Sequence, residues 1–215
     1  MRIVSALESA RAMMVRNQLV ARGITDPLVL DAMARVPREE FVPEKVRVNA
    51  YDDGPLPLSG GQTISQPFVV ARMSEALQLT PGNRVLDVGT GSGYQAAVLA
   101  AMGVHVYSVE RDRSLHLLAR ETLDRVGLEA VQLGHGDGHE GWPSAAPFAG
   151  ILVAAVSDRA PAALLKQLLD GGRMVMPLRM EDGEEMLVLI HRQGEVYHRE
   201  ALLPVRFVPL QPGLA

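Results

Sequence analysis

Short apolar runs alternate with helical patterns through the second half of the chain. The runs are RVLDV, VHVYSVE, EAVQL, ILVAAV and RMVMPL, and the helical patterns between them begin near residues 94, 112 and 160. This alternation predicts an α/β protein in which helices cover a mainly parallel sheet. Beyond them, EMLVLIHR and VYHREALLPVRFVPL flank the turn Gln193-Gly194-Glu195 and predict antiparallel strands that complete the sheet edge.

The first eighty residues follow a different pattern. Residues 5–22 have apolar positions at helical spacing up to Gly23, and Thr25-Asp26-Pro27 is a typical start for a second helix that ends near Arg35. Residues 41–67 have no periodicity and are rich in proline and glycine, but apolar side chains are embedded in them. We therefore expect an N-terminal helical region followed by a long loop that is ordered and packed.

No repeat or linker divides the chain, so we expect residues 1–215 to form a single domain. Within it, residues 1–80 hold the helices and the loop, residues 81–180 hold a ligand-binding core, and residues 181–215 hold the edge strands.

Composition and charge exclude several classes of protein. The net charge of −4 argues against a nucleic-acid partner, whose phosphates demand a basic surface. The absence of cysteine excludes disulfides and thiolate chemistry. Arginine and glutamate interrupt the apolar positions of the N-terminus, so we expect neither a signal peptide nor a membrane span. A cytoplasmic enzyme is the resulting expectation.

A glycine-rich turn follows the first predicted parallel strand. Gly89, Thr90, Gly91, Ser92 and Gly93 lie between RVLDV and a helix, where residues without a Cβ let the backbone approach a ligand closely. The spacing departs from the G-x-G-x-x-G of dinucleotide folds, which weakens a pyrophosphate-binding interpretation. A glycine turn alone is often merely structural.

Two acidic residues follow the next two predicted strands. Glu110 ends VHVYSVE, where a carboxylate can accept hydrogen bonds from both ribose hydroxyls. Asp137, beside Gly138 in HGDGHEGW, is placed to accept from the exocyclic amine of an adenine. Each acid alone is a weak signal, but together with the glycine turn they indicate an adenosyl ligand without a diphosphate. S-adenosylmethionine is the obvious candidate.

With these residues in this order, the chain resembles the protein-L-isoaspartate (D-aspartate) O-methyltransferases. The matching segments occur in the same order along essentially the whole chain: VPREEFVP, YDDGPLPL, GGQTISQP, RVLDVGTGSGYQAAVLA, SVER, HGDG, DGGRMVMP and VRFVPL. The resemblance implies a Rossmann-like, doubly wound, seven-stranded methyltransferase fold. It also implies methylation, with S-adenosylmethionine, of the free α-carboxylate of L-isoaspartyl residues in damaged proteins and peptides.

The resemblance also assigns residues. The active-site serine of the family falls on Ser65, with Gln62 and Thr63 toward the substrate and Ile64 toward the cofactor. Val205 and Arg206 fall on a strand that borders the substrate cleft in the family.

Structural interpretations of both segments remain open. Thr63 or Ser65 can instead cap a helix that begins near Pro67, and VRFVPL can be a plain edge strand.

The chemistry supports the same assignment. A carboxylate with an ordinary pKa of about 3.9 is ionised at neutral pH, so its methylation needs no general base. It needs an acceptor oxygen held in line with the methyl group, and the small hydroxyls of a tight loop suit that task. We therefore expect Ser65 to orient the acceptor without forming a covalent intermediate.

Other features leave alternatives. His135, Asp137 and His139 form an H-x-D-x-H cluster, but the absence of a second ligand motif argues against a metal site. The segment of residues 147–157 departs from the family pattern, since Ala149 replaces an aspartate and Val156-Ser157 replaces alanine-proline. This departure leaves a catalytically silent S-adenosylmethionine-binding protein as an alternative. A specialised relative that methylates normal aspartate in a peptide precursor is a second alternative. A monomer is the default expectation.

Overall fold

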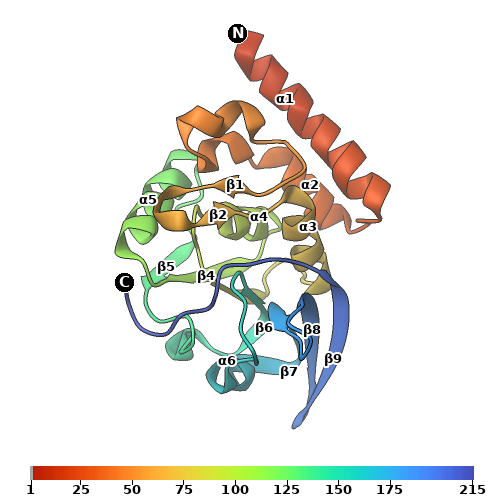
Figure 1. Cartoon of the computed structure of the whole chain (residues 1–215), viewed down its shortest axis with the longest axis vertical. Coiled ribbons are helices and arrows are strands. Elements are labelled where there is room, and N and C mark those ends of the chain that lie inside the picture. Colours follow the sequence, from red (N-terminus) through yellow and green to blue (C-terminus); the bar gives the residue numbers. More distant parts are fainter. Residues whose placement is uncertain (1) are drawn as a thin grey trace.

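The computed structural model describes residues 2–215, and the side chains of all of these except residues 2–5 and 59. A seven-stranded sheet crosses the centre of the molecule in the order β5-β4-β3-β6-β7-β8-β9 (Figure 1). Its strands are β3 (Arg84–Val88), β4 (His105–Glu110), β5 (Gln132–His135), β6 (Phe148–Val153), β7 (Leu168–Arg179), β8 (Glu185–Gln193) and β9 (Val196–Pro204). The first five are parallel, and β8 and β9 are antiparallel, as the sequence predicts.

The helices of the second half connect the parallel strands. They are α4 (Tyr94–Ala101), α5 (Arg113–Arg125) and α6 (Ala162–Gln167). Because β3 to β7 are parallel, the carboxyl ends of all five strands lie at one edge of the sheet. The chain passes from β3 to β4 on one side and returns to β6 on the other, which makes the carboxyl end of β3 the topological switch point.

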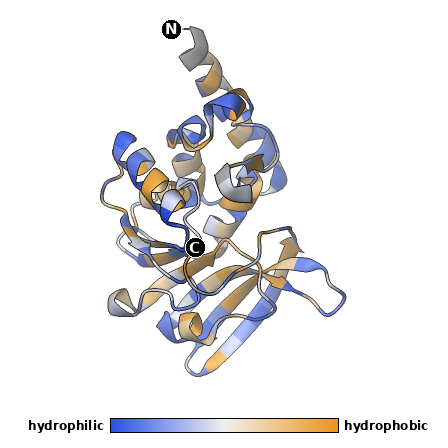
Figure 2. Ribbon diagram, turned by 60° about the vertical axis from the view of Figure 1, so that its left-hand side comes forward, coloured by the Kyte–Doolittle hydropathy of each residue, from blue (hydrophilic) through white to orange (hydrophobic). Residues whose placement is uncertain are grey.

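Apolar side chains fill both faces of the sheet. Val85, Leu152 and Val175 belong to the core under α2, α3 and α4, while their neighbours Leu86 and Ile151 belong to the core on the opposite face. This alternation follows from the two-residue period of a strand. Figure 2 shows the corresponding hydrophobic colouring along the central strands. The sheet is therefore doubly wound, as expected.

The helices of the N-terminal region pack on one face of the sheet, and loop residues 61–65 reach the cavity at its carboxyl edge (Figure 1). This region contains α1 (Arg2–Met14), α2 (Pro27–Arg35) and α3 (Pro67–Ala76), together with the short strands β1 (Leu56–Pro57) and β2 (Thr63–Ile64). The expected first helix is not α-helical throughout, because a π-helical turn (Val15–Leu19) and a 3-10 turn (Val20–Arg22) follow α1.

The second expected helix and the packed loop are confirmed. The Asp26 side chain accepts from Leu28 N at the start of α2. Phe41, Tyr51 and Ile64 are buried in the core, which orders the long loop between the helices.

Three boundaries differ from the sequence-based expectations. The strand expected at EAVQL begins only at Gln132, because residues 128–131 turn back at the end of α5. The helix expected over residues 160–169 is shorter, and Leu168 already belongs to β7. VRFVPL is not a strand of the sheet, since β9 ends at Pro204, opposite the beginning of β8. Only Glu185 of β8 lies beyond this point, and its carbonyl accepts a hydrogen bond from Val205 N at 2.8 Å.

No helix among residues 2–215 combines the length and the apolar character that crossing a lipid bilayer requires.

Candidate active site

A cavity of about 330 Å³ opens at the carboxyl edge of the sheet, above the switch point. Its walls come from distant stretches of the chain: residues 61–65, residues 88–92 with 94 and 95, residues 109–112, residues 154–155 and residues 207–211, together with 70 and 138. In Figure 1 the C-terminal segment runs from β9 across this edge toward β5 and α5. The cavity is therefore assembled from segments that lie far apart in the sequence.

Most residues singled out from the sequence line this cavity. They are Gln62, Thr63, Ile64, Ser65, Gly89, Thr90, Gly91, Ser92, Glu110 and Gly138. Gly93, Asp137, Val205 and Arg206 are not among the lining residues. The structure thus brings the predicted acceptor loop and the predicted cofactor turn to one site.

The glycine turn adopts backbone angles that favour glycine. The φ angles of Gly89, Gly91 and Gly93 are 93°, 52° and 89°, all in the left-handed region. At Gly93 an added Cβ would lie 3.4 Å from the Cβ of Ala119 and 3.5 Å from Leu123. These are ordinary contact distances, so the backbone angle, and not a lack of space, favours glycine at position 93. Gly89 and Gly91 line the cavity.

Glu110 ties the glycine turn to the next crossover. Its carboxylate is buried, and Oε2 accepts from Gly91 N at 2.9 Å while Oε1 accepts from Asp112 N at 2.9 Å. Each carboxylate oxygen has a second lone pair, so both can still accept from hydroxyls in the cavity. The free acceptor positions of the Glu110 carboxylate suit the two hydroxyl donors of a ribose.

A buried chain of polar side chains supports the turn from below. Thr90 Oγ1 lies 2.6 Å from Ser108 Oγ, and Ser108 Oγ donates to Asp87 Oδ2 at 2.7 Å. Asp87 is fully buried and its Oδ1 has no hydrogen-bond partner among the described residues. Burial raises the pKa of Asp87 to about 7, and the nearby charge of Glu110 acts in the same direction.

The loop that carries Ser65 is held by its backbone. Leu58 N donates to Gln62 O at 2.7 Å, which closes the turn between β1 and β2, and the Ser65 carbonyl accepts from Arg38 Nη2 at 2.8 Å. The N-cap residue of α3 is Gln66, and no side chain caps that helix. The capping interpretation of Thr63 and Ser65 is therefore wrong, and the Ser65 side chain is left for the cavity that it lines.

Asp137 has partners that the sequence did not indicate. Its Oδ1 accepts from His139 N at 2.8 Å, and its Oδ2 accepts from Gly213 N at 2.6 Å. Burial works against ionisation, but these backbone hydrogen bonds keep the pKa of Asp137 below its ordinary value. Arg111 Nε donates to Gly213 O at 3.0 Å. Asp137 and Arg111 together hold the C-terminal segment in place.

Residues 207–211 form a cavity wall that the sequence analysis missed, since it singled out Val205 and Arg206 instead. The wall is fixed by Val156, whose N donates to Val208 O at 2.9 Å and whose O accepts from Leu210 N at 2.7 Å. The apolar run at these positions, broken by Pro209, was the available signal that the segment leaves the sheet.

The departures from the family pattern lie outside the cavity. Ala149, Val156 and Ser157 are not among its lining residues, whereas Ala154 and Ala155 are. Ser157 N donates to Pro177 O at 3.3 Å, a hydrogen bond that a proline at this position could not make. The substitution thus adds a contact to the end of β7.

Replacing Gly91 with valine is expected to weaken binding of S-adenosylhomocysteine about 10- to 100-fold, because the β-branched side chain strains a left-handed residue in the cavity wall. Isothermal titration calorimetry measures this directly. Gly127→Val is the matched control, since Gly127 has a φ of 76°, open space around its Cβ and a place outside the cavity. Equal affinities of the two variants would contradict the assignment of the turn.

Asp87→Asn is expected to flatten the pH dependence of stability. Because the folded-state pKa of about 7 lies above the ordinary 3.8, the folded protein binds the extra proton between these values. Its free energy of unfolding therefore falls as pH rises through that window. Urea unfolding between pH 4 and pH 8 should show a smaller decline in the variant.

Asp112→Asn is the control for this measurement, because the pKa of Asp112 is shifted in the opposite direction to that of Asp87. The hydrogen bond from the Ser114 side chain lowers the pKa of Asp112 below 3.8, so its stabilisation is lost only at more acidic pH. If the free energy of unfolding of Asp87→Asn falls with pH as steeply as that of the parent protein, the raised pKa of Asp87 is wrong.

Comparisons with known proteins identify the family to which the chain belongs. The family model described as protein-L-isoaspartate(D-aspartate) O-methyltransferase matches residues 9–214. A protein-L-isoaspartate O-methyltransferase of Methylorubrum populi is 52% identical over 207 residues, which are 96% of this chain and 97% of that protein. Another, of Marinobacter nauticus, is 53% identical over 95% of this chain and 94% of its own length.

Two solved structures share the fold. One described as a protein-L-isoaspartate O-methyltransferase aligns with a TM-score of 0.86 at 30% identity and covers 95% of this chain and 67% of its own. A putative enzyme of the same name from Plasmodium falciparum, in complex with S-adenosyl-L-homocysteine, aligns with a TM-score of 0.80 at 26% identity over 95% and 98% of the two chains. The chain therefore belongs to the protein-L-isoaspartate(D-aspartate) O-methyltransferase family.

Proposed function

We propose that this protein transfers the methyl group of S-adenosylmethionine to the free α-carboxylate of L-isoaspartyl residues in damaged proteins and peptides. Membership of the family supports this activity. The observation that carries the proposal is that one cavity is lined both by the glycine turn and by the loop of Ser65. A cofactor wall and an acceptor wall thus face the same space.

The cofactor side of the cavity suits an adenosyl ligand. Its volume of about 330 Å³ lies in the range of small-molecule sites. We assign Gly89 and Gly91 to the backbone wall, Glu110 to the ribose hydroxyls, and Ile64 and Gly138 to apolar contacts. When bound, S-adenosylmethionine supplies an electrophilic methyl group on a sulfonium. Direct contact between Asp137 and the adenine remains a prediction.

The acceptor side needs orientation more than acid–base chemistry. The described residues that line the cavity include no histidine, lysine or cysteine. An isoaspartyl α-carboxylate is already ionised at neutral pH, so its methylation requires none of these residues as a general base. Ser65 donates a hydrogen bond that orients the carboxylate, with Gln62 and Thr63 beside it. Orientation of this kind contributes up to about 7 to 11 kcal/mol.

The position of the altered segment favours an active enzyme over a silent binding protein. Ala149, Val156 and Ser157 do not line the cavity, whereas Ala154 and Ala155 do. Val205 and Arg206 precede the lining residues 207–211, so we place an extended peptide substrate along this segment.

The decisive experiment uses labelled S-adenosylmethionine and paired peptides that differ only in L-isoaspartate versus aspartate at one position. We expect a base-labile methyl ester on the isoaspartyl peptide alone. Ester on the aspartyl peptide would instead indicate a specialised aspartate methyltransferase. Cofactor binding without ester on either peptide would indicate the silent protein.

Ser65→Ala is expected to lower turnover of the isoaspartyl peptide about 10- to 100-fold, because one hydrogen bond to a charged acceptor is lost. Affinity for S-adenosylhomocysteine and the Tm should change little. Ser144→Ala, at an exposed serine outside the cavity, is the control. A variant with lower Tm and normal turnover would show that Ser65 is only structural.

A further inference from the structure

Arg38 is a fully buried cation held by main-chain oxygens. It lies at the start of η3 (Arg38–Phe41), and its relative exposure is 0%. Its Nε donates to Ala50 O at 2.7 Å and its Nη2 donates to Ser65 O at 2.8 Å. The planar guanidinium thus joins two loop segments that lie 15 residues apart in sequence, at positions 50 and 65.

The charge of Arg38 is balanced by an aromatic ring and by carbonyl dipoles. Cζ of Arg38 lies 4.8 Å from the centroid of the Tyr94 ring. Among the described residues no carboxylate hydrogen-bonds to the guanidinium, and Nη1 has no hydrogen-bond partner. A buried charge is costly unless its surroundings compensate it, so the geometry of these contacts is demanding. Burial lowers the pKa of Arg38 accordingly.

The two sides that Arg38 connects are opposite parts of the candidate site. Ser65 lines the cavity from the loop after β2, and Tyr94 lines it from the first residue of α4, directly after the glycine turn. Arg38 itself does not line the cavity. It therefore lies behind both walls and is not exposed to the cavity.

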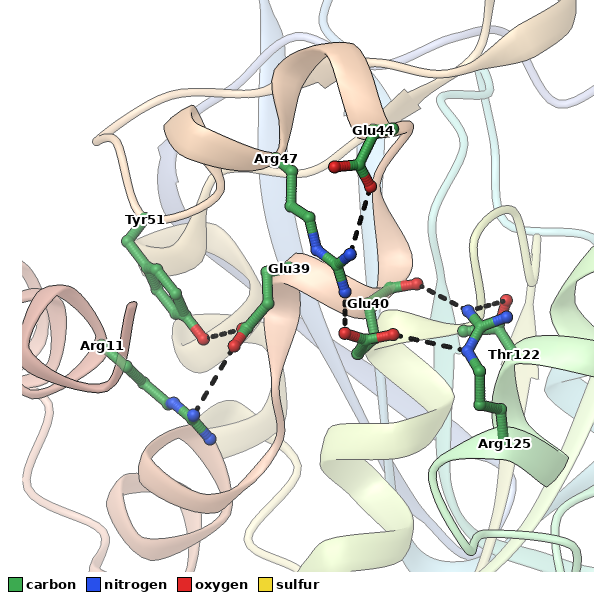
Figure 3. A network of polar contacts seen from close by, with 8 residues as sticks. All are labelled: Arg11, Glu39, Glu40, Glu44, Arg47, Tyr51, Thr122 and Arg125. Carbon is green, nitrogen blue, oxygen red and sulfur yellow. Dashed lines mark hydrogen bonds and ion pairs between the residues drawn. The ribbon is translucent and has the colours of Figure 1, made fainter. Parts of the chain in front are cut away.

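The two residues that follow Arg38, Glu39 and Glu40, are anchored on three sides (Figure 3). Glu39 accepts from the Tyr51 hydroxyl and pairs with Arg11 of α1 at 3.7 Å. The next residue, Glu40, pairs with Arg47 and with Arg125 of α5.

Arg125 Nη2 also donates to the Glu40 carbonyl at 3.2 Å. Because η3 is fixed in this way to α1, to the long loop and to α5, a shift of Arg38 would have to break several contacts.

We propose that Arg38 is a positioning residue for methyl transfer, which sets the distance between the Ser65 loop and the helix that follows the glycine turn. The inference rests on the proposed function, because it takes Ser65 to orient the acceptor. Lysine cannot replace this function: its single ammonium group lacks the planar fork that reaches two carbonyls while stacking on a ring.

The test compares Arg38→Lys with Arg120→Lys. Arg120 also donates to two backbone carbonyls, those of Val131 and Leu133 at 3.5 and 3.4 Å, but it lies outside the cavity. We expect Arg38→Lys to lower kcat for the isoaspartyl peptide about 100-fold, the scale of a displacement near 1 Å, while affinity for S-adenosylhomocysteine stays close to that of the parent. Arg120→Lys should leave both unchanged.

A second readout is independent of turnover. Amide hydrogen exchange of residues 62–66 should accelerate in Arg38→Lys, because the Ser65 carbonyl loses its anchor, while exchange in the strands of the sheet is preserved. Arg120→Lys should show parent-like exchange in this loop.

The outcomes separate the two proposals. If the parent protein forms no isoaspartyl ester, the proposed function fails, and exchange in the loop still tests the anchoring. If the parent is active and Arg38→Lys matches Arg120→Lys in kcat and in exchange, the positioning role is overturned. If Arg38→Lys does not fold, Arg38→Gln is measured in the same way. Failure of both variants to fold would show that Arg38 serves the fold as a whole and would also overturn the proposal.

Discussion

The hydrogen bond between Gly91 N and the Glu110 carboxylate fixes the relation between two neighbouring strand ends, and the site is built around it. The same carboxylate accepts from Asp112 N, so the turn after β3 and the start of the next crossover move as one unit. A buried carboxylate with backbone donors on both oxygens is strongly held. Its unused lone pairs then face a cavity whose shape is already set.

This constraint explains how much of the site could be predicted from sequence. The alternation of apolar runs determines the parallel sheet, and a parallel sheet determines where its carboxyl ends meet. The glycine turn and Glu110 are each local to one strand end, so sequence alone predicted the strand ends at which they line the cavity. Ser65 required the resemblance, because nothing in its own segment indicates which distant loop it faces.

The rest depended on contacts between segments far apart in the chain. The amide of Gly213 occupies one oxygen of Asp137, and no periodicity reports such a pairing. Residues 207–211 leave the sheet only because β8 begins at Glu185, whose oxygens accept from Val205 N and Phe207 N. In the sequence, nothing distinguishes Arg38 from any other loop arginine, because its burial appears only in the folded molecule.

The walls of the cavity come from segments that span positions 61 to 211 of the chain. No local fragment can assemble such a pocket, so its appearance during folding must coincide with closure of the longest loops. A small molecule bound there would act as a thermodynamic crosslink, which raises the free energy of global unfolding in proportion to the logarithm of its concentration. The cofactor would then stabilise the fold of the chain in addition to supplying the methyl group.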